Sequence, residues 1–262
     1  HVGLALGIVA AGQALGQGAV PYGAAILIGG VGWREALSTM GLITLIGLAP
    51  LALLIRQAPR ASTVSAENTE DVDASPVPLS TNAVIAWISV AVVFCCTCMS
   101  VPLMHLVPLV QDRGIALDDA ASVLFVMMMT AVIGRIAFGK LADIIGAIPA
   151  YFTASLWQTA LVFLFTQMDG LTTFYIFAVV YGFGYAGVMT GIIVCVRTLT
   201  PLSRRASALG IVTMFAWMGH ALGGYQGGFF YDMIGSYSIS YANAVLAGVI
   251  NLVIVAALYL TI

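Results

Sequence analysis

Three of the chain's few charged side chains lie together in one short stretch, GRIAFGKLADIIG at residues 134–146. Only 8% of the 262 residues are Asp, Glu, Lys or Arg, so Arg135, Lys140 and Asp143 stand out at the end of an apolar segment. An arginine in a hydrocarbon environment costs about 2.5–3.5 kcal/mol unless it faces protein, water or a ligand. Its planar guanidinium suits carboxylates, which it binds through two parallel hydrogen bonds. Arg135 is therefore a candidate anion-binding residue; the alternative is that its side chain extends to a polar surface.

Two histidines, His105 and His220, lie in other apolar segments. Histidine titrates near neutral pH, so each could carry a proton or bind an anion when charged. The alternative for each is a hydrogen-bonded packing residue. Trp217 precedes His220 and Gln226 follows it on the same segment, and both could add stacking and hydrogen bonding to one pocket. We therefore expect His220 to be the stronger candidate.

The remaining reactive side chains do not indicate metal or nucleotide chemistry. The four cysteines lie in apolar segments, and no His or further Cys stands nearby to complete a soft-metal site. We expect them to be small packing residues. No complete P-loop, HExxH zinc pattern or GxSxG elbow occurs in the sequence. We therefore expect no cofactor, no bound metal, no nucleic-acid partner and no enzymatic activity.

The segments that carry these candidates are unusually apolar. The chain is 61% hydrophobic with a mean hydropathy of +1.05, whereas apolar residues make up roughly half of a soluble domain. Backbone groups in lipid must be hydrogen-bonded within the segment, so uninterrupted apolar runs of about 20 residues indicate helices rather than strands. The predicted fold is all-α, a polytopic bundle of transmembrane helices in a lipid bilayer. The eight predicted spans are 3–28, 36–55, 83–110, 120–139, 147–166, 171–195, 207–230 and 240–261.

The placement of basic residues predicts the orientation of this bundle. If the chain crosses the bilayer at each span, one side holds only Arg34 and Arg113. The other side holds the remaining basic residues, and we call it the richer side. By the positive-inside rule the richer side is cytoplasmic, so both ends of the chain are expected in the cytoplasm. The first residues lack a charged leader and begin with His, so we expect a truncated start. The richer side collects seven of the nine basic residues: Arg56, Arg60, Arg135, Lys140, Arg197, Arg204 and Arg205.

One polar segment divides the chain. Residues 57–82 are rich in Ser, Thr, Pro and acidic residues and are predicted to form a disordered cytoplasmic linker. Residues 1–56 then hold two helices and residues 83–262 hold six. Many transporters are built from paired halves with the substrate site between them, which suggests that the first half also had six helices. Within the first span, Gly12 and Gly16 form a GxxxG pair that favours close helix packing.

Three motifs resemble one known family. GKLADIIG (139–146) resembles the loop motif of the major facilitator superfamily, GxLaDrxGrk, which joins the second and third helices of each six-helix half. Residues 3–36 and 219–238 are similar to the fifth and eleventh helices, with their outer turns, in the monocarboxylate transporter and oxalate/formate antiporter branch. The resemblance implies a twelve-helix bundle of which about eight helices are present and the first four are absent. It also implies a multi-pass protein of a bacterial inner membrane.

The resemblance implies a gate or structural role for the loop motif, carried by Gly139, Lys140, Asp143 and Gly146. This sequence departs from the family motif, because Ile144 replaces a basic residue and 147–148 replace the trailing basic pair. We expect a weak charge network there, with the acidic position retained.

The arginine at the Arg135 position lines the pathway in that branch and is taken to bind the substrate carboxylate. Two companion residues are missing, because Ala131 stands where monocarboxylate carriers have an Asp, and His220 is the only candidate where oxalate carriers have a Lys. The resemblance places His105 and His220 on the seventh and eleventh helices, beside the central cavity. A substrate with one carboxylate is therefore expected.

These features favour a secondary active transporter of small organic anions, expected to be monocarboxylates, that works by alternating access. Coupling to protons through a histidine stays open. One alternative is a polytopic sensor or scaffold that moves no solute. Another is an exporter of hydrophobic or cationic compounds, for which an acidic residue would be expected in the cavity; no predicted span interior contains Asp or Glu.

Overall fold

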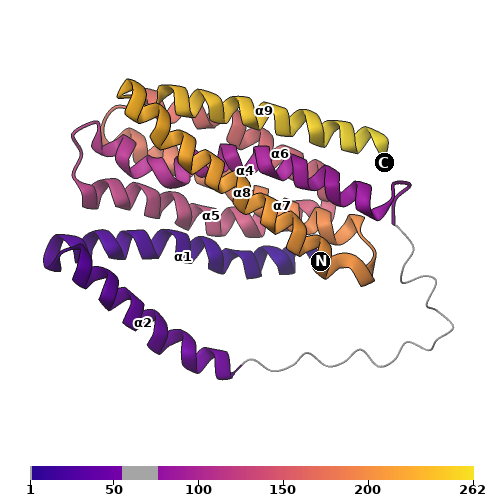
Figure 1. Ribbon diagram of the computed structural model, residues 1–262, viewed down its shortest axis with the longest axis horizontal. Helices are drawn as coiled ribbons and strands as arrows, with labels where there is room; N and C mark the ends of the chain where they lie inside the picture. The colour runs from indigo at the N-terminus through magenta and orange to yellow at the C-terminus, as the bar shows by residue number, and fades with distance from the viewer. Residues whose placement is uncertain (1, 55–75) are drawn as a thin grey trace.

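The computed structural model describes residues 2–54 and 76–262 and consists of long, nearly parallel or antiparallel helices (Figure 1). Eight helical segments in this part of the chain are long and apolar enough to cross a membrane, which confirms the predicted all-α transmembrane bundle. They are α1 (Val2–Val31), α2 (Trp33–Leu53), α4 (Thr81–Gln111), α5 (Leu117–Ile145), α6 (Ala147–Leu161) with its 3₁₀ extension η2 (Val162–Gln167), α7 (Leu171–Leu199), α8 (Arg205–Ile234, preceded by η3, Leu202–Arg204) and α9 (Ser238–Thr261).

The helices from α4 to α9 form one bundle, and α1 lies along its side against α5 (Figure 1). Within the bundle, α5 packs on α7, α7 on α6, and α4 on both α8 and α9. The next helix, α2, contacts α1 and then diverges from the bundle. Ala36 is therefore the single buried residue of α2 among the residues that the structure describes. The first predicted unit, residues 1–56, thus meets the six-helix unit through α1. Most of the predicted linker lies outside the described residues.

The loop predicted at residues 140–146 is helical instead. The α5 helix continues through Gly139, Lys140 and Asp143 to Ile145. Only Gly146, with φ of 95°, interrupts the helix before α6 begins. No residue from Lys140 to Ile145 opposes helix, and continuing the helix satisfies the backbone at the membrane surface. The motif is therefore the last turns of a helix followed by a single-residue corner, for which glycine is suited because it tolerates positive φ.

The α1 and α5 backbones touch at glycines. A side chain at Gly7 would collide with the carbonyl oxygen of Arg135, and one at Gly139 would collide with the carbonyl oxygen of Gly3. Glycine allows this approach because it has no Cβ. Gly12 and Gly16 of the predicted GxxxG pair make no such contact among the described residues, since a Cβ at either would meet nothing within 4 Å there.

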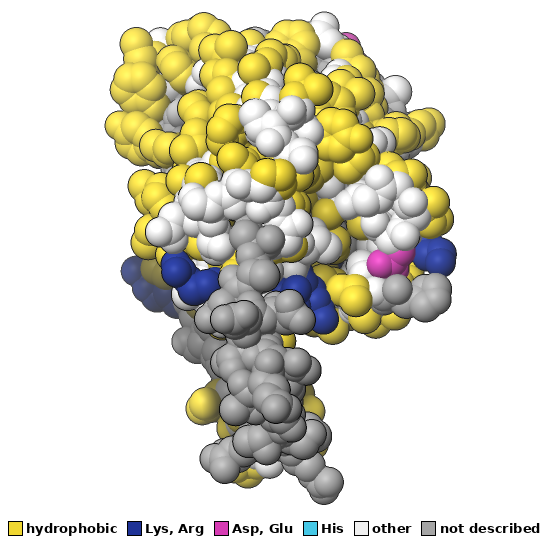
Figure 2. All heavy atoms as spheres, turned by 90° about the vertical axis from the view of Figure 1, so that its right-hand side faces the viewer, with side chains coloured by type: hydrophobic (Ala, Val, Ile, Leu, Met, Phe, Trp, Pro, Cys, Tyr) yellow, Lys and Arg dark blue, Asp and Glu magenta, His cyan; other side chains and the backbone are white. Residues whose placement is uncertain are grey.

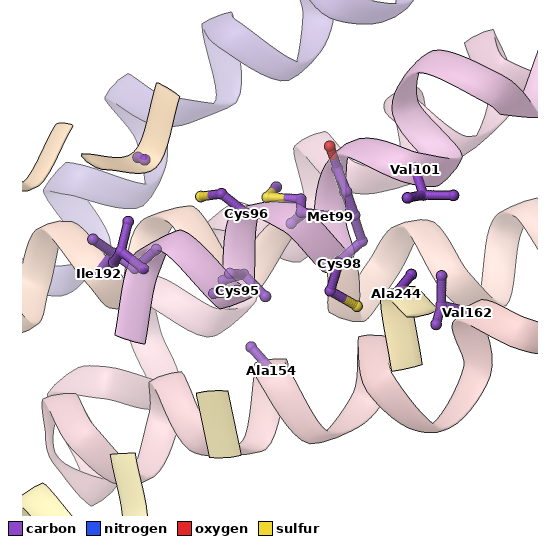
Figure 3. Close-up of a cluster of buried hydrophobic side chains, with 14 of the residues drawn as sticks. Cys95, Cys96, Cys98, Met99, Val101, Ala154, Val162, Ile192 and Ala244 are labelled. Atoms are coloured by element: carbon purple, nitrogen blue, oxygen red, sulfur yellow. The ribbon is translucent and has the colours of Figure 1, made fainter. Parts of the chain in front are cut away.

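The α4 cysteines lie in the main hydrophobic core. Cys95, Cys96 and Cys98 are fully buried beside Met99, in the cluster shown in Figure 3. Cys195 is also buried, and all four thiols are free. Their expected role as small packing residues agrees with this environment.

Basic side chains gather at one end of the bundle, which we call the basic end. Lys140, Arg197, Arg204 and Arg205 lie there, and Figure 2 looks onto it, with Lys and Arg side chains spread across the face. Arg113 lies at the turn between α4 and α5, at the other end, where its Nη1 pairs with Asp169 Oδ1 at 2.8 Å. Arg56 and Arg60, also predicted on the richer side, lie outside the described residues.

Candidate functional site

A cavity of about 210 Å³ lies where α1 meets the six-helix bundle, between α1, α4, α7 and α8. Its wall is mostly apolar, with polar groups supplied by α1 and α8. The small, mainly apolar shape with a few converging polar side chains is typical of a ligand site. The lining residues are Gln13, Gln17, Met99, Met189, Ile192, Ile193, Leu209, Val212, Thr213, Ala216, Trp217 and His220.

Arg135 lies directly behind this wall. Its side chain is fully buried, so it does not extend to a polar surface as the alternative expectation had it. Its Nη1 donates to Gln13 Oε1 at 3.0 Å and its Nη2 donates to Gln17 Oε1 at 3.4 Å. The two glutamines therefore separate the guanidinium from the cavity that they line.

The positive charge of Arg135 is not neutralised by any ion pair in the described part of the chain. The partners of its Nη atoms are neutral amide oxygens, and its Nε has no hydrogen-bond partner among the described residues. One turn earlier on α5 stands the buried Ala131, which cannot supply a carboxylate. A buried charge attracts opposite charge strongly because screening is weak there. The arrangement can thus stabilise an anion in the cavity.

Two of the predicted site residues on α8 line the same cavity. His220 and Trp217 are one turn apart, with ring centroids separated by 5.3 Å. The Nδ1 of His220 lies 3.0 Å from the carbonyl oxygen of Ala216. In the neutral ring this contact requires the hydrogen to be on Nδ1, which leaves Nε2 as an acceptor. His220 can therefore accept a proton while it lines the cavity.

The other two predicted site residues lie elsewhere. His105 Nε2 is 2.8 Å from the carbonyl oxygen of Gly224 and joins α4 to α8. Gln226 joins α8 to α9, because it donates to the Ser240 carbonyl oxygen and accepts from Asn243. Gln226 follows His220 by six residues, a rotation of about 240° beyond one full turn, whereas Trp217 is about one turn away. Helical rotation thus separates Gln226 from the pocket it was expected to share.

Sequence reasoning missed the polar residues that α1 contributes. Gln13 and Gln17 are four residues apart in an apolar helix, which places both amides on one face. That spacing was the available signal.

A second hollow continues from the cavity toward the basic end. It measures about 350 Å³ and shares Ile193 and Leu209 with the cavity wall. Arg197 and Arg205 line it, with Leu6 of α1 on the opposite side. We call it the basic groove. Arg204 is adjacent in sequence but does not line the groove; its Nη2 donates to Asn82 Oδ1 at 3.0 Å.

The acidic residue of the loop motif contacts α1. Both carboxylate oxygens of Asp143 accept hydrogen bonds from backbone N–H groups in the first turn of α1. Lys140 is exposed on the surface of α5. Asp143 therefore links the end of α5 to α1 at the basic end.

Comparisons with known proteins agree with this architecture. The family model of the Major Facilitator Superfamily matches residues 1–156 and 86–262, which together span the chain. Monocarboxylate transporter 13 of Rattus norvegicus is 31% identical over 147 residues, which are 55% of this chain and 34% of that protein. The match thus covers about a third of the relative's length. The family matches and the eight membrane-length helices show that this chain is an integral, multi-pass membrane protein that belongs to the Major Facilitator Superfamily.

Proposed function

We propose that the protein is a secondary active transporter of small organic anions, with short monocarboxylates as its substrate class. The observation that carries this proposal is the buried, un-neutralised guanidinium of Arg135 behind the cavity wall. The family match supports transport in general, and the similarity to a monocarboxylate transporter supports the substrate class.

The position of the cavity supports alternating access. Its wall combines α1, from the expected first half, with α4, α7 and α8 from the six-helix unit. Transporters built from paired halves bind substrate at such an interface and expose it by rocking one half against the other. A solute in this cavity would touch both halves.

The size and chemistry of the cavity favour a small, singly charged solute. Its volume of about 210 Å³ is below the roughly 300–1,000 Å³ typical of drug-sized ligands. One guanidinium suits one carboxylate, and the apolar side chains around Met99, Met189 and Val212 suit a short aliphatic tail. His220 is the proposed site for a coupled proton, because it is the titratable histidine in this wall.

The basic groove provides a route for anions. Arg197 and Arg205 raise the local concentration of negative solutes at its mouth. The gathering of basic residues there favours a cytoplasmic location for this end, with both chain ends on the same side, and a bacterial inner membrane is the proposed setting. Asp143 and the other motif residues form the proposed gate next to the groove.

Uptake into proteoliposomes tests the proposal. We expect the full-length protein to transport at least one of acetate, propionate, lactate and pyruvate, with counterflow, and Arg135→Ala to abolish uptake while Arg135→Lys retains part of it. Unchanged uptake by Arg135→Ala would remove the proposed site. Saturable binding without counterflow would indicate a sensor or scaffold, and transport of cations alone would indicate an exporter.

A further inference from the structure

We propose that Gln13 and Gln17 form a neutral amide latch that keeps Arg135 charged and is displaced by the carboxylate of the substrate. This proposal rests on the function proposed above and deepens it by naming two specificity-determining residues. It also assigns the latch a role in coupling substrate binding to movement between α1 and α5.

The geometry of the latch provides one acceptor for each end of the guanidinium. Gln13 Oε1 accepts from Nη1 at 3.0 Å and Gln17 Oε1 accepts from Nη2 at 3.4 Å. The residues are four apart on α1, so one helix face presents both amides. Their other surfaces line the cavity, next to His220 and Trp217.

The neutrality of both partners is the feature that matters for an anion. A glutamate at either position would form an ion pair with the buried Arg135 and would compete with the substrate. A neutral amide oxygen competes weakly, because a carboxylate adds full charge attraction to the same hydrogen bonds. Each displaced glutamine can then turn its NH₂ group toward the bound carboxylate. The latch thus satisfies the guanidinium when the cavity is empty and assists binding when it is filled.

The latch connects two helices that approach closely elsewhere. Gly7 of α1 lies against the backbone of Arg135 on α5. Gln13 and Gln17, which bond the side chain of the same arginine, lie about two turns further along α1. Replacement of the amides by substrate removes two side-chain bonds between α1 and α5. Binding therefore changes what holds the two units together, which is the requirement for a conformational response to substrate.

The test compares Gln13→Glu and Gln17→Glu with Gln226→Glu in the full-length protein. Gln226 is a matched control, since its amide bonds Ser240 and Asn243 and does not line the cavity. With acetate, propionate, lactate and pyruvate as probes, we expect KM for the transported acid to rise about tenfold or more in both latch variants, as loss of one strong charge contact would give. The control should keep its KM. An unchanged KM in both latch variants would overturn the latch.

Thermal unfolding provides a readout that does not depend on the substrate. We expect Gln13→Glu to raise Tm through the new ion pair, and Gln13→Glu combined with Arg135→Gln to lose this gain. Equal effects of Gln13→Glu in both backgrounds would overturn the contact, as would failure of both Glu variants to fold.

If Arg135→Ala leaves uptake unchanged, the proposed function loses its site. If Arg135→Ala abolishes uptake while both Glu variants keep the wild-type KM, only the latch fails.

Discussion

Asp143, near the end of α5, accepts hydrogen bonds from the start of α1: its Oδ1 is 2.9 Å from Gly3 N and its Oδ2 is 3.1 Å from Leu4 N. These bonds join the backbone of α1 to a side chain near the end of α5. The acidic residue of the loop motif thus links the end of α5 to α1. It does so although Ile144 replaces the basic residue that the family motif has next to it.

The first prediction concerns this contact. Asp143→Ala removes both acceptors and should lower the free energy of unfolding, because it deletes two bonds between α5 and α1. Asp143→Asn keeps one acceptor oxygen and should cost less. Chemical unfolding of the purified protein in detergent measures both values. Wild-type stability of Asp143→Ala would show that this contact does not stabilise the protein.

The second prediction concerns the close approach of α1 and α5. Gly7→Ala places a methyl group against the Arg135 carbonyl oxygen, and it should destabilise the protein by about 1–3 kcal/mol, as overpacking does. Gly12→Ala is the control, because its Cβ meets nothing within 4 Å in the described structure. Thermal unfolding should separate the two variants. Equal Tm values for both would show that α1 does not approach α5 in this way.

A third prediction distinguishes the two histidines. His220→Gln should raise KM for the transported carboxylate and flatten the dependence of uptake on pH, because His220 lines the cavity. His105→Gln should leave KM unchanged and lower Tm, since it weakens the link to Gly224 between α4 and α8. Uptake across a range of pH, together with unfolding curves, checks both. The reverse pattern would move the proton site to His105.

A fourth prediction tests the basic groove as an entry route. Arg205→Gln should lower the uptake rate several-fold at low ionic strength and less at high salt, where charges are screened. Arg204→Gln carries the same change in charge at the next residue, but that side chain points to Asn82 and not into the groove. It should keep the wild-type rate. Identical salt dependence in the two variants would argue against steering through the groove.

The helices could be predicted from the sequence because lipid leaves the backbone few alternatives. Each apolar run must satisfy its own hydrogen bonds, so composition over about 20 residues is sufficient to identify a span. The boundaries were less accurate where polar residues follow the apolar run. Lys140 and Asp143 suggested a loop, yet α5 continues through them to Ile145.

The candidate site was predictable only in part. The cost of burying Arg135 could be inferred from its type and surroundings, and Trp217 lies where helical spacing from His220 places it. Gln226 lies outside this pocket, because its rotation around α8 brings its amide to Ser240 and Asn243 of α9.

The sequence by itself determined that this chain forms membrane-length helices and that Arg135 is the charged residue within the predicted spans, since both properties depend on local composition. Only the tertiary structure decided what surrounds that charge. Gln13 and Gln17 are 122 and 118 residues away from Arg135 in the chain, and they meet it because glycines let α1 and α5 pack closely. Such contacts depend on how helix faces fit together, which no single segment specifies.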